Sequence, residues 1–228
     1  MKLLLITSEF PPLPGGIGNH ALNLAKALHA QGYQVRVLCD FRAQETEQER
    51  AFDRSLAFQV VRVPRYQLIW RTYWQRVVEA LRLFRSKEDI TVIASGKFSL
   101  WLGAFGRLFF PKHRYIGIVH GSEIALGDRL SRWLTHRSLG RFHRLIAVSG
   151  FTRQLLQEAN KSWPITVINN GFTPAVIEEG WRKERLQGCP ALITVGNVTY
   201  RKGQQNVIKA LPIIREAYPD VHYHIVGI

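Results

Sequence analysis

The feature that most constrains the fold of this 228-residue chain is an alternation of short apolar runs with segments of helical periodicity. Residues 2–7 suit a strand buried on both faces, apolar residues recur at helical spacing over 21–28, and residues 33–39 suit the next strand. We predict Asn19 as the N-cap and Gly32 as the C-cap of the intervening helix. A strand, a crossover helix and a parallel strand are the building unit of doubly wound sheets.

This unit recurs along the chain, with helical patterns between most of the later strands. Further strands are predicted at residues 58–63, 90–94, 115–119, 145–148 and 165–168. Strands that alternate with helices in this way indicate an α/β fold with a parallel sheet covered on both faces. We therefore predict a Rossmann-like doubly wound parallel sheet.

A second alternation begins after the segment 169–172. A polar helical stretch is predicted from Pro174 to about residue 187, followed by a strand over 191–196, a helix over 204–218 and a strand from 221 onward. We predict a first domain over residues 1–180, and over 181–228 a linker and the truncated start of a second Rossmann-like domain.

The charge and the cysteines limit the classes of partner and site. Lys and Arg number 31 against 17 Asp and Glu, and the net charge of +14 predicts an anionic partner: nucleic acid, an anionic membrane or a phosphorylated substrate. Cys39 and Cys189 are far apart and have no metal-ligand spacing, so we expect neither a disulfide framework nor a metal site. A reducing cytoplasm fits this. The apolar run at the start is too short for a signal peptide, and no stretch reaches the roughly 20 residues of a spanning helix.

A glycine-rich loop joins the first predicted strand to the first predicted helix. Ligands of open parallel sheets bind beyond the carboxyl ends of the strands, and Gly15 and Gly16 lie there, just before a helix N-terminus. Glycines let main-chain N–H groups approach a phosphate that a Cβ would hold away. The GxGxxG pattern of dinucleotide-binding proteins is absent, however, and on this loop alone a plain tight turn is the slightly better interpretation.

Five stretches taken together favour the ligand-binding interpretation. They cover residues 11–38, 120–123, 146–156, 167–172 and 195–203. In order and spacing they resemble the family-4 retaining glycosyltransferases of GT-B fold, over nearly the whole chain. The resemblance implies two Rossmann-like domains that face a cleft, the N-terminal one binding the acceptor and the C-terminal one binding the nucleotide-sugar donor.

The resemblance also implies roles for residues of the first domain. Gly15 and Gly16 would lie against the donor diphosphate. His120 follows a predicted strand, and a neutral imidazole there can hydrogen-bond a sugar hydroxyl, while Glu123 could orient an acceptor hydroxyl. We predict His120 and Glu123 as catalytic residues; the alternative for His120 is a histidine that only packs at a strand end.

In the second domain the predicted donor contacts are Asn197, Arg201 and Lys202. Charge-assisted bonds from Arg201 and Lys202 to a leaving diphosphate would strengthen as charge develops on it. Asn197 stands where the family commonly has an arginine, and Arg201 could take over that charge; a solvated basic turn is the alternative. The family's pair of glutamates seven residues apart has no counterpart before Ile228, so we expect the 228-residue chain alone to be inactive.

Two basic stretches predict where the acceptor binds. Residues 65–85 and 129–144 each contain five arginines, interspersed with aromatic and apolar residues. Arginine stems and aromatic rings suit a lipid interface, although amphipathic helices packed on the sheet would explain most of the leucines. We expect a cytoplasmic enzyme, peripheral on the inner face of the cell membrane.

The expected function is therefore transfer of a sugar from a nucleotide-sugar donor to a glycan or lipid-linked acceptor with retention of configuration. No metal and no cofactor is expected. Two alternatives remain: a non-catalytic membrane or assembly subunit with the same fold, and a basic nucleic-acid-binding protein. No nucleic-acid partner is expected, because the chain lacks a recognisable nucleic-acid-binding module.

Overall fold

The computed structural model describes residues 1–42, 46–124, 128–171 and 184–227. The chain divides into two compact units, Met1–Thr173 and Pro174–Ile228, and each is described here by itself. The predicted domain boundary at residue 180 and most of the polar helix predicted after Pro174 fall outside the described residues. Residues 184–187, where that helix was predicted to end, are not helical.

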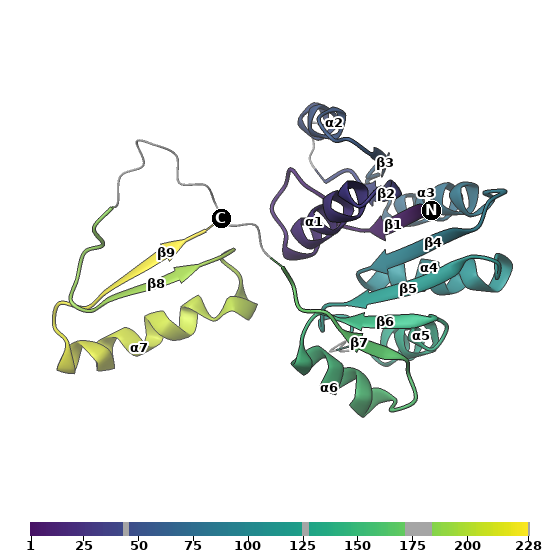
Figure 1. Cartoon of the computed structure of the whole chain (residues 1–228). Helices are drawn as coiled ribbons and strands as arrows, with labels where there is room; N and C mark the ends of the chain where they lie inside the picture. The colour runs from purple at the N-terminus through teal and green to yellow at the C-terminus, as the bar shows by residue number, and fades with distance from the viewer. Residues whose placement is uncertain (43–45, 125–127, 172–183, 228) are drawn as a thin grey trace. The chain divides into compact units, whose positions relative to one another are not determined.

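The first unit is a seven-stranded sheet with helices on both faces (Figure 1). Its strands are β1 (Lys2–Thr7), β2 (Gln34–Asp40), β3 (Gln59–Val63), β4 (Ile90–Ser95), β5 (Arg114–Val119), β6 (Arg144–Ala147) and β7 (Ile165–Val167). Its helices are α1 (Gly16–Ala30), α2 (Glu47–Arg54), α3 (Ile69–Phe84), α4 (Lys97–Phe109), α5 (Arg129–Leu139) and α6 (Gly150–Ala159). Every neighbouring pair of strands is parallel, in the order β3-β2-β1-β4-β5-β6-β7. The predicted doubly wound sheet is confirmed.

Alternation of side chains along the strands creates two separate cores. In β1, Leu3 and Leu5 belong to the core that contains Ala21 and Ala25 of α1, whereas Leu4 and Ile6 belong to the core formed with α3, α4, α5 and α6. Successive side chains of a strand point to opposite faces, so a strand that is apolar throughout must be covered on both sides. This explains why the strand sequences are continuous apolar runs.

The direction in which the chain adds strands reverses between β1 and β4. The chain runs from β1 outward through β2 to β3, then returns to β4 beside β1 and continues outward to β7. The connections after two such neighbouring strands run in opposite directions. In open α/β sheets, ligands bind at the carboxyl ends of strands at this kind of switch point. The loop after β1 and the residues that follow β4 and β5 all lie at this edge.

Both predicted caps of α1 need correction. The N-cap is Gly15 and not Asn19, whose main-chain N–H already bonds the Gly15 carbonyl at 2.9 Å inside the helix. The C-cap is Gln31; Gly32 follows it with φ +86°, the left-handed conformation that glycine adopts without strain. The sequence pattern located the helix, but the loop geometry set its first residue.

The basic stretch 65–85 does not present all its arginines to solvent. Arg76 on α3 is only 5% exposed, and its Nε donates to Asp40 Oδ1 at 2.8 Å, with a second bond from Nη2 to Asp40 Oδ2. Arg65, Arg71, Arg82 and Arg85 are exposed. The prediction of a surface cation was therefore wrong for Arg76, because an acidic residue at the end of β2 faces it inside the fold.

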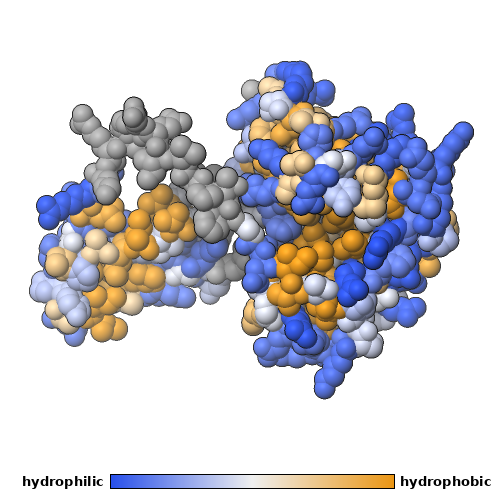
Figure 2. Space-filling model, viewed as in Figure 1, coloured by the Kyte–Doolittle hydropathy of each residue, from blue (hydrophilic) through white to orange (hydrophobic). Residues whose placement is uncertain are grey.

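The second unit contains a two-stranded parallel sheet and one long helix. Strands β8 (Ala191–Val195) and β9 (His222–Val226) pair, and α7 (Gln204–Ala217) connects them after a 3-10 turn over Tyr200–Lys202. Figure 2 shows apolar residues gathered on the visible face of this unit. The exposed large apolar side chains of the two strands are those of Ile193, Val195, Ile225 and Val226.

Candidate functional site

The loop that follows β1 places three glycines at the start of α1, and each has a different environment. A Cβ on Gly18 would lie 3.2 Å from the main chain of Glu9 and Phe10, so this glycine allows the helix to pack on the loop. A Cβ on Gly15 would clash with Glu9 Oε2. A Cβ on Gly16 would meet nothing within 4 Å. Gly16 therefore borders open space at the N-terminal end of the helix dipole, where anions are stabilised.

His120 lies at the carboxyl end of β5 and is held by its neighbours. Its Nε2 is 2.9 Å from Oγ of Ser95, the last residue of β4, and its main-chain N–H donates to Glu123 Oε2 at 3.1 Å. The ring of His20 from α1 stands edge-on to it with ring centroids 5.2 Å apart. The structure thus brings together the glycine-bearing helix α1, β4 and the predicted residues His120 and Glu123.

Both histidines of this cluster are neutral at physiological pH. Burial lowers the pKa of His120 to about 4, with a smaller contribution from nearby His20, and burial also lowers the pKa of His20. A buried site disfavours the charged imidazolium. A neutral imidazole has one N–H donor and one acceptor nitrogen, so His120 can bond Ser95 with one nitrogen and a ligand hydroxyl with the other.

Glu123 is 2% exposed, far more buried than a surface carboxylate. Burial raises its pKa, opposed by hydrogen bonds from its own main-chain N–H and from those of His120 and Gly121. Its second oxygen, Oε1, has no hydrogen-bond partner among the described residues. Glu123 supports the turn that carries His120, and its predicted contact with an acceptor hydroxyl stays a prediction.

His20 is the member of the cluster that sequence reasoning missed. It lies four residues after Gly16, and residues four apart share one face of a helix. Its Nδ1 is buried without a hydrogen-bond partner among the described residues. Once α1 is known to begin at Gly16, the spacing alone would place His20 on the face of α1 that carries Gly16.

The predicted donor residues of the second unit share one turn after β8. The Asn197 carbonyl accepts a bond from Gln204 Nε2 at 3.1 Å, and Lys202 is exposed. Gly196 and Gly203 flank this turn with φ of +146° and +77°. The side chain of Arg201 lies outside the part of the chain that the structure describes. The turn can present cations, and its contact with a diphosphate stays a prediction.

In the ranges of both units that the structure describes, no group of three or more His, Cys, Asp and Glu side chains lies close enough to hold a metal ion. Cys39 and Cys189 are free cysteines, the first buried and the second exposed.

The strand order and the switch point between β1 and β4, with polar groups at the strand ends, define a Rossmann-like α/β domain. The sequence profile of Glycosyltransferase Family 4 matches residues 14–176, which include α1, β4 and His120. The chain belongs to glycosyltransferase family 4, as its motifs predicted.

Two curated relatives match almost the full chain. One is a GDP-mannose-dependent monoacylated alpha-(1-6)-phosphatidylinositol monomannoside mannosyltransferase of Corynebacterium glutamicum, 24% identical over 99% of this chain and 61% of its own length. The other is a GDP-mannose-dependent alpha-(1-6)-phosphatidylinositol monomannoside mannosyltransferase of Mycolicibacterium smegmatis, 24% identical over 99% of this chain and 60% of its own length. The chain thus spans about three fifths of the length of these relatives.

Solved structures show the same fold. Anabaena HepE in complex with UDP and glucose matches with a TM-score of 0.67 at 15% identity, over 100% of this chain and 62% of HepE. An S. aureus TarM mutant in complex with Fondaparinux, alpha-GlcNAc-glycerol and UDP matches with a TM-score of 0.70 at 9% identity, over 99% of this chain and 72% of TarM. The predicted GT-B class of fold is confirmed.

Proposed function

We propose that the protein of which this chain forms part transfers a sugar from a nucleotide-sugar donor to a glycan or lipid-linked acceptor, with retention of configuration. The observation that carries the proposal is the cluster of Ser95, His120 and His20 beside the glycine-bearing end of α1, in a chain that belongs to glycosyltransferase family 4. The names of both curated relatives support a nucleotide-sugar donor and a lipid-linked acceptor.

The residues of the two units have complementary roles in this proposal. The main-chain N–H groups at the start of α1, beside the open space at Gly16, bind the donor diphosphate. Arg201 and Lys202 offset the negative charge that develops on the leaving diphosphate, and Asn197 lies on the same turn. Neutral His120 hydrogen-bonds the donor sugar, and Glu123 fixes the turn that carries His120.

The direct test uses the full-length protein. It is incubated with GDP-mannose, UDP-glucose and UDP-N-acetylglucosamine, each with membrane lipid extract, and the anomeric configuration of the product is determined by NMR. We expect turnover with one donor and retention of its configuration. Failure of all donors, or an inverted product, would contradict the proposal.

Gly16→Val tests the phosphate role of the loop. A Cβ at this position meets nothing within 4 Å, so the variant should fold, and its melting temperature should stay within a few degrees of the wild type. The branched side chain would occupy the space through which a phosphate approaches the N–H groups, and we expect the loss of one electrostatic contact to lower donor turnover by about 100-fold or more. Turnover close to wild type would exclude the phosphate role.

A membrane surface on the first unit extends the proposal. The side chains of Trp70, Tyr73, Trp74 and Val77 on α3, with Phe98 on α4, line an open apolar cup of about 390 Å³. Trp70 and Trp74 are 63% and 64% exposed. The stretch 65–85 that carries these aromatic side chains also carries exposed arginines. Aromatic rings and cations together suit binding to anionic lipid at the inner face of the cell membrane. No helix in the described ranges is both long and apolar enough to cross a bilayer.

Vesicle binding tests this surface. We expect binding to vesicles with 30% anionic lipid that weakens as salt rises, because salt screens charges over about 10 Å at 0.1 M ionic strength. Serine in place of both Trp70 and Trp74 should weaken it at least tenfold, since each indole loses its burial in the interface. Phe151→Ser, at a 70% exposed position on α6, is the matched control and should bind like the wild type. Equal binding to neutral vesicles, or stronger binding to nucleic acid, would contradict the membrane surface.

A further inference from the structure

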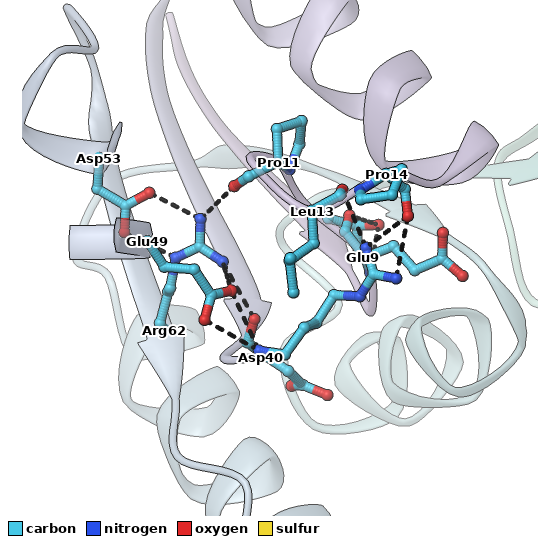
Figure 3. A network of polar contacts seen from close by, with 10 residues as sticks. Glu9, Pro11, Leu13, Pro14, Asp40, Glu49, Asp53 and Arg62 are labelled. Atoms are coloured by element: carbon cyan, nitrogen blue, oxygen red, sulfur yellow. Dashed lines mark hydrogen bonds and ion pairs between the residues drawn. The ribbon is translucent and has the colours of Figure 1, made fainter. Parts of the chain in front are cut away.

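The loop between β1 and α1 is fastened by arginine side chains from elsewhere in the fold. Pro11, Pro12 and Pro14 have no N–H group with which to bond neighbouring main chain. The carbonyls of Pro11, Leu13 and Pro14 accept hydrogen bonds from Arg62 and Arg42 (Figure 3). The position of this loop, and of the α1 N-terminus that follows it, therefore depends on these two guanidinium groups.

Arg62 on β3 uses all five of its N–H donors in this arrangement. Its Nε and Nη2 bond the two carboxylate oxygens of Asp53 at 2.7 and 2.8 Å, and Nη1 bonds Glu49 Oε1 at 2.8 Å. The remaining donors reach the Asp40 carbonyl at 3.2 Å and the Pro11 carbonyl at 2.5 Å. A guanidinium with every donor engaged has one permitted orientation, so it fixes Pro11 relative to β3.

Burial makes this arrangement stiff. The side chain of Arg62 is 2% exposed and that of Glu49 0% exposed. The guanidinium also lies over two aromatic rings, 5.7 Å from the centroid of Phe10 in the loop and 5.8 Å from that of Phe41. Its positive charge meets two carboxylates, those of Glu49 and Asp53, so it has no excess charge to offer a phosphate.

Arg42 completes the attachment nearer to α1. Its Nη1 donates to the Leu13 and Pro14 carbonyls, and its Nη2 donates to the Pro14 carbonyl, each at 3.1 Å. The main-chain N–H of Arg42 bonds Glu49 at 3.1 and 3.2 Å to the two carboxylate oxygens, so Glu49 links the two arginines. Nη1 of Arg42 also lies 3.4 Å from the position of a Cβ on Gly15, the N-cap of α1.

We propose that Arg62 and Arg42 are positioning residues that hold the loop 11–15 and thereby aim the N-terminus of α1 at the donor. Both would act through the loop carbonyls and not by touching the substrate. The effect on donor binding rests on the proposed function. The attachment of the loop by the two arginines can be measured without an activity assay.

Arg42→Ala is the decisive variant. Removal of Arg62 leaves two carboxylates without their cation and risks unfolding, whereas Arg42 is partly exposed and its guanidinium bonds the two carbonyls described above. The main-chain bond from Arg42 to Glu49 is retained in an alanine variant. Arg54→Ala is the matched control, because Arg54 lies on α2 and forms an exposed ion pair with Glu47, with side chains 67% and 72% exposed.

The first measurement uses the 228-residue chain and ¹⁵N NMR. In Arg42→Ala we expect the order parameters of the Leu13 and Gly15 amides to fall from about 0.85 to below about 0.6, and the Asn19 amide to exchange roughly tenfold faster. Amides of β4 and β5 should keep their protection, and Arg42→Lys, which can still reach one carbonyl, should recover part of the order. Unchanged order in a folded Arg42→Ala variant would overturn the proposal.

The second measurement uses the full-length protein and separates the two hypotheses. Arg42→Ala should raise the KM for the nucleotide sugar about tenfold and change kcat less, because a misplaced loop weakens donor binding first. A lower kcat with unchanged KM would contradict the positioning role. If the wild type transfers no sugar, the proposed function fails, and the NMR measurement still decides whether Arg42 holds the loop.

Discussion

Replacement of Arg62 with alanine should lower the free energy of unfolding by about 3–5 kcal/mol, the range found when one partner of a buried ion pair is removed. The variant would leave Glu49, with its side chain 0% exposed, and Asp53, with its side chain 17% exposed, without their shared cation. It would also remove the bond to the Pro11 carbonyl. Most of the loss comes from the removal of the cation that the two carboxylates share.

Urea denaturation followed by circular dichroism and tryptophan fluorescence measures this loss. Arg54→Ala, which removes an exposed ion pair, should cost no more than about 1 kcal/mol. Arg62→Ala combined with Glu49→Gln and Asp53→Asn should recover part of the stability, because neutral amides cost less to bury than charged carboxylates. A loss below 1 kcal/mol in Arg62→Ala would show that the two carboxylates reach solvent without difficulty.

Replacement of His120 with alanine should lower the turnover of the full-length protein by about 100- to 1,000-fold, the usual effect of losing one positioned hydrogen-bond donor in a reacting site. The imidazole is held by Ser95 at 2.9 Å and is already oriented before a ligand arrives. Ser95→Ala should cause a smaller loss because it frees the ring without removing it. His29→Ala, at an exposed position in the last turn of α1, is the matched control and should retain activity.

The pH dependence of kcat/KM tests the state of His120. Its pKa is lowered to about 4, mainly by burial, so the imidazole is neutral above that value and gains a proton only below it. Activity that needs the neutral form should therefore be level between pH 5 and 7.5 as far as His120 is concerned, and should fall as pH approaches 4. A limb with a midpoint near pH 6.5 that disappears in His120→Ala would contradict this assignment, because it would show an unshifted histidine.

The sequence determined the sheet because its signals are local. Residues 2–7, 90–94 and 115–119 are apolar without interruption, and such runs alternating with helical periodicity predict parallel strands buried on both faces. The structure places β1, β4 and β5 there, with ends within one residue of the predicted ranges. The strand ends then located Gly16 and His120 at the ligand-binding edge, although their contacts with a donor stay predictions.

Only the tertiary structure decided which charged and polar groups meet. The sequence pattern predicts Arg76 as a surface cation of an amphipathic helix, yet its side chain is buried against Asp40, 36 residues earlier in the chain. Arg62 bonds a carbonyl 51 residues away, and His20 lies against His120 from a different element. Periodicity reports which face of an element is buried, but it carries no information about the partner that another strand or loop supplies. The fold was therefore predictable from local pattern, whereas the attachment of the loop and the neutrality of the histidines depend on long-range packing.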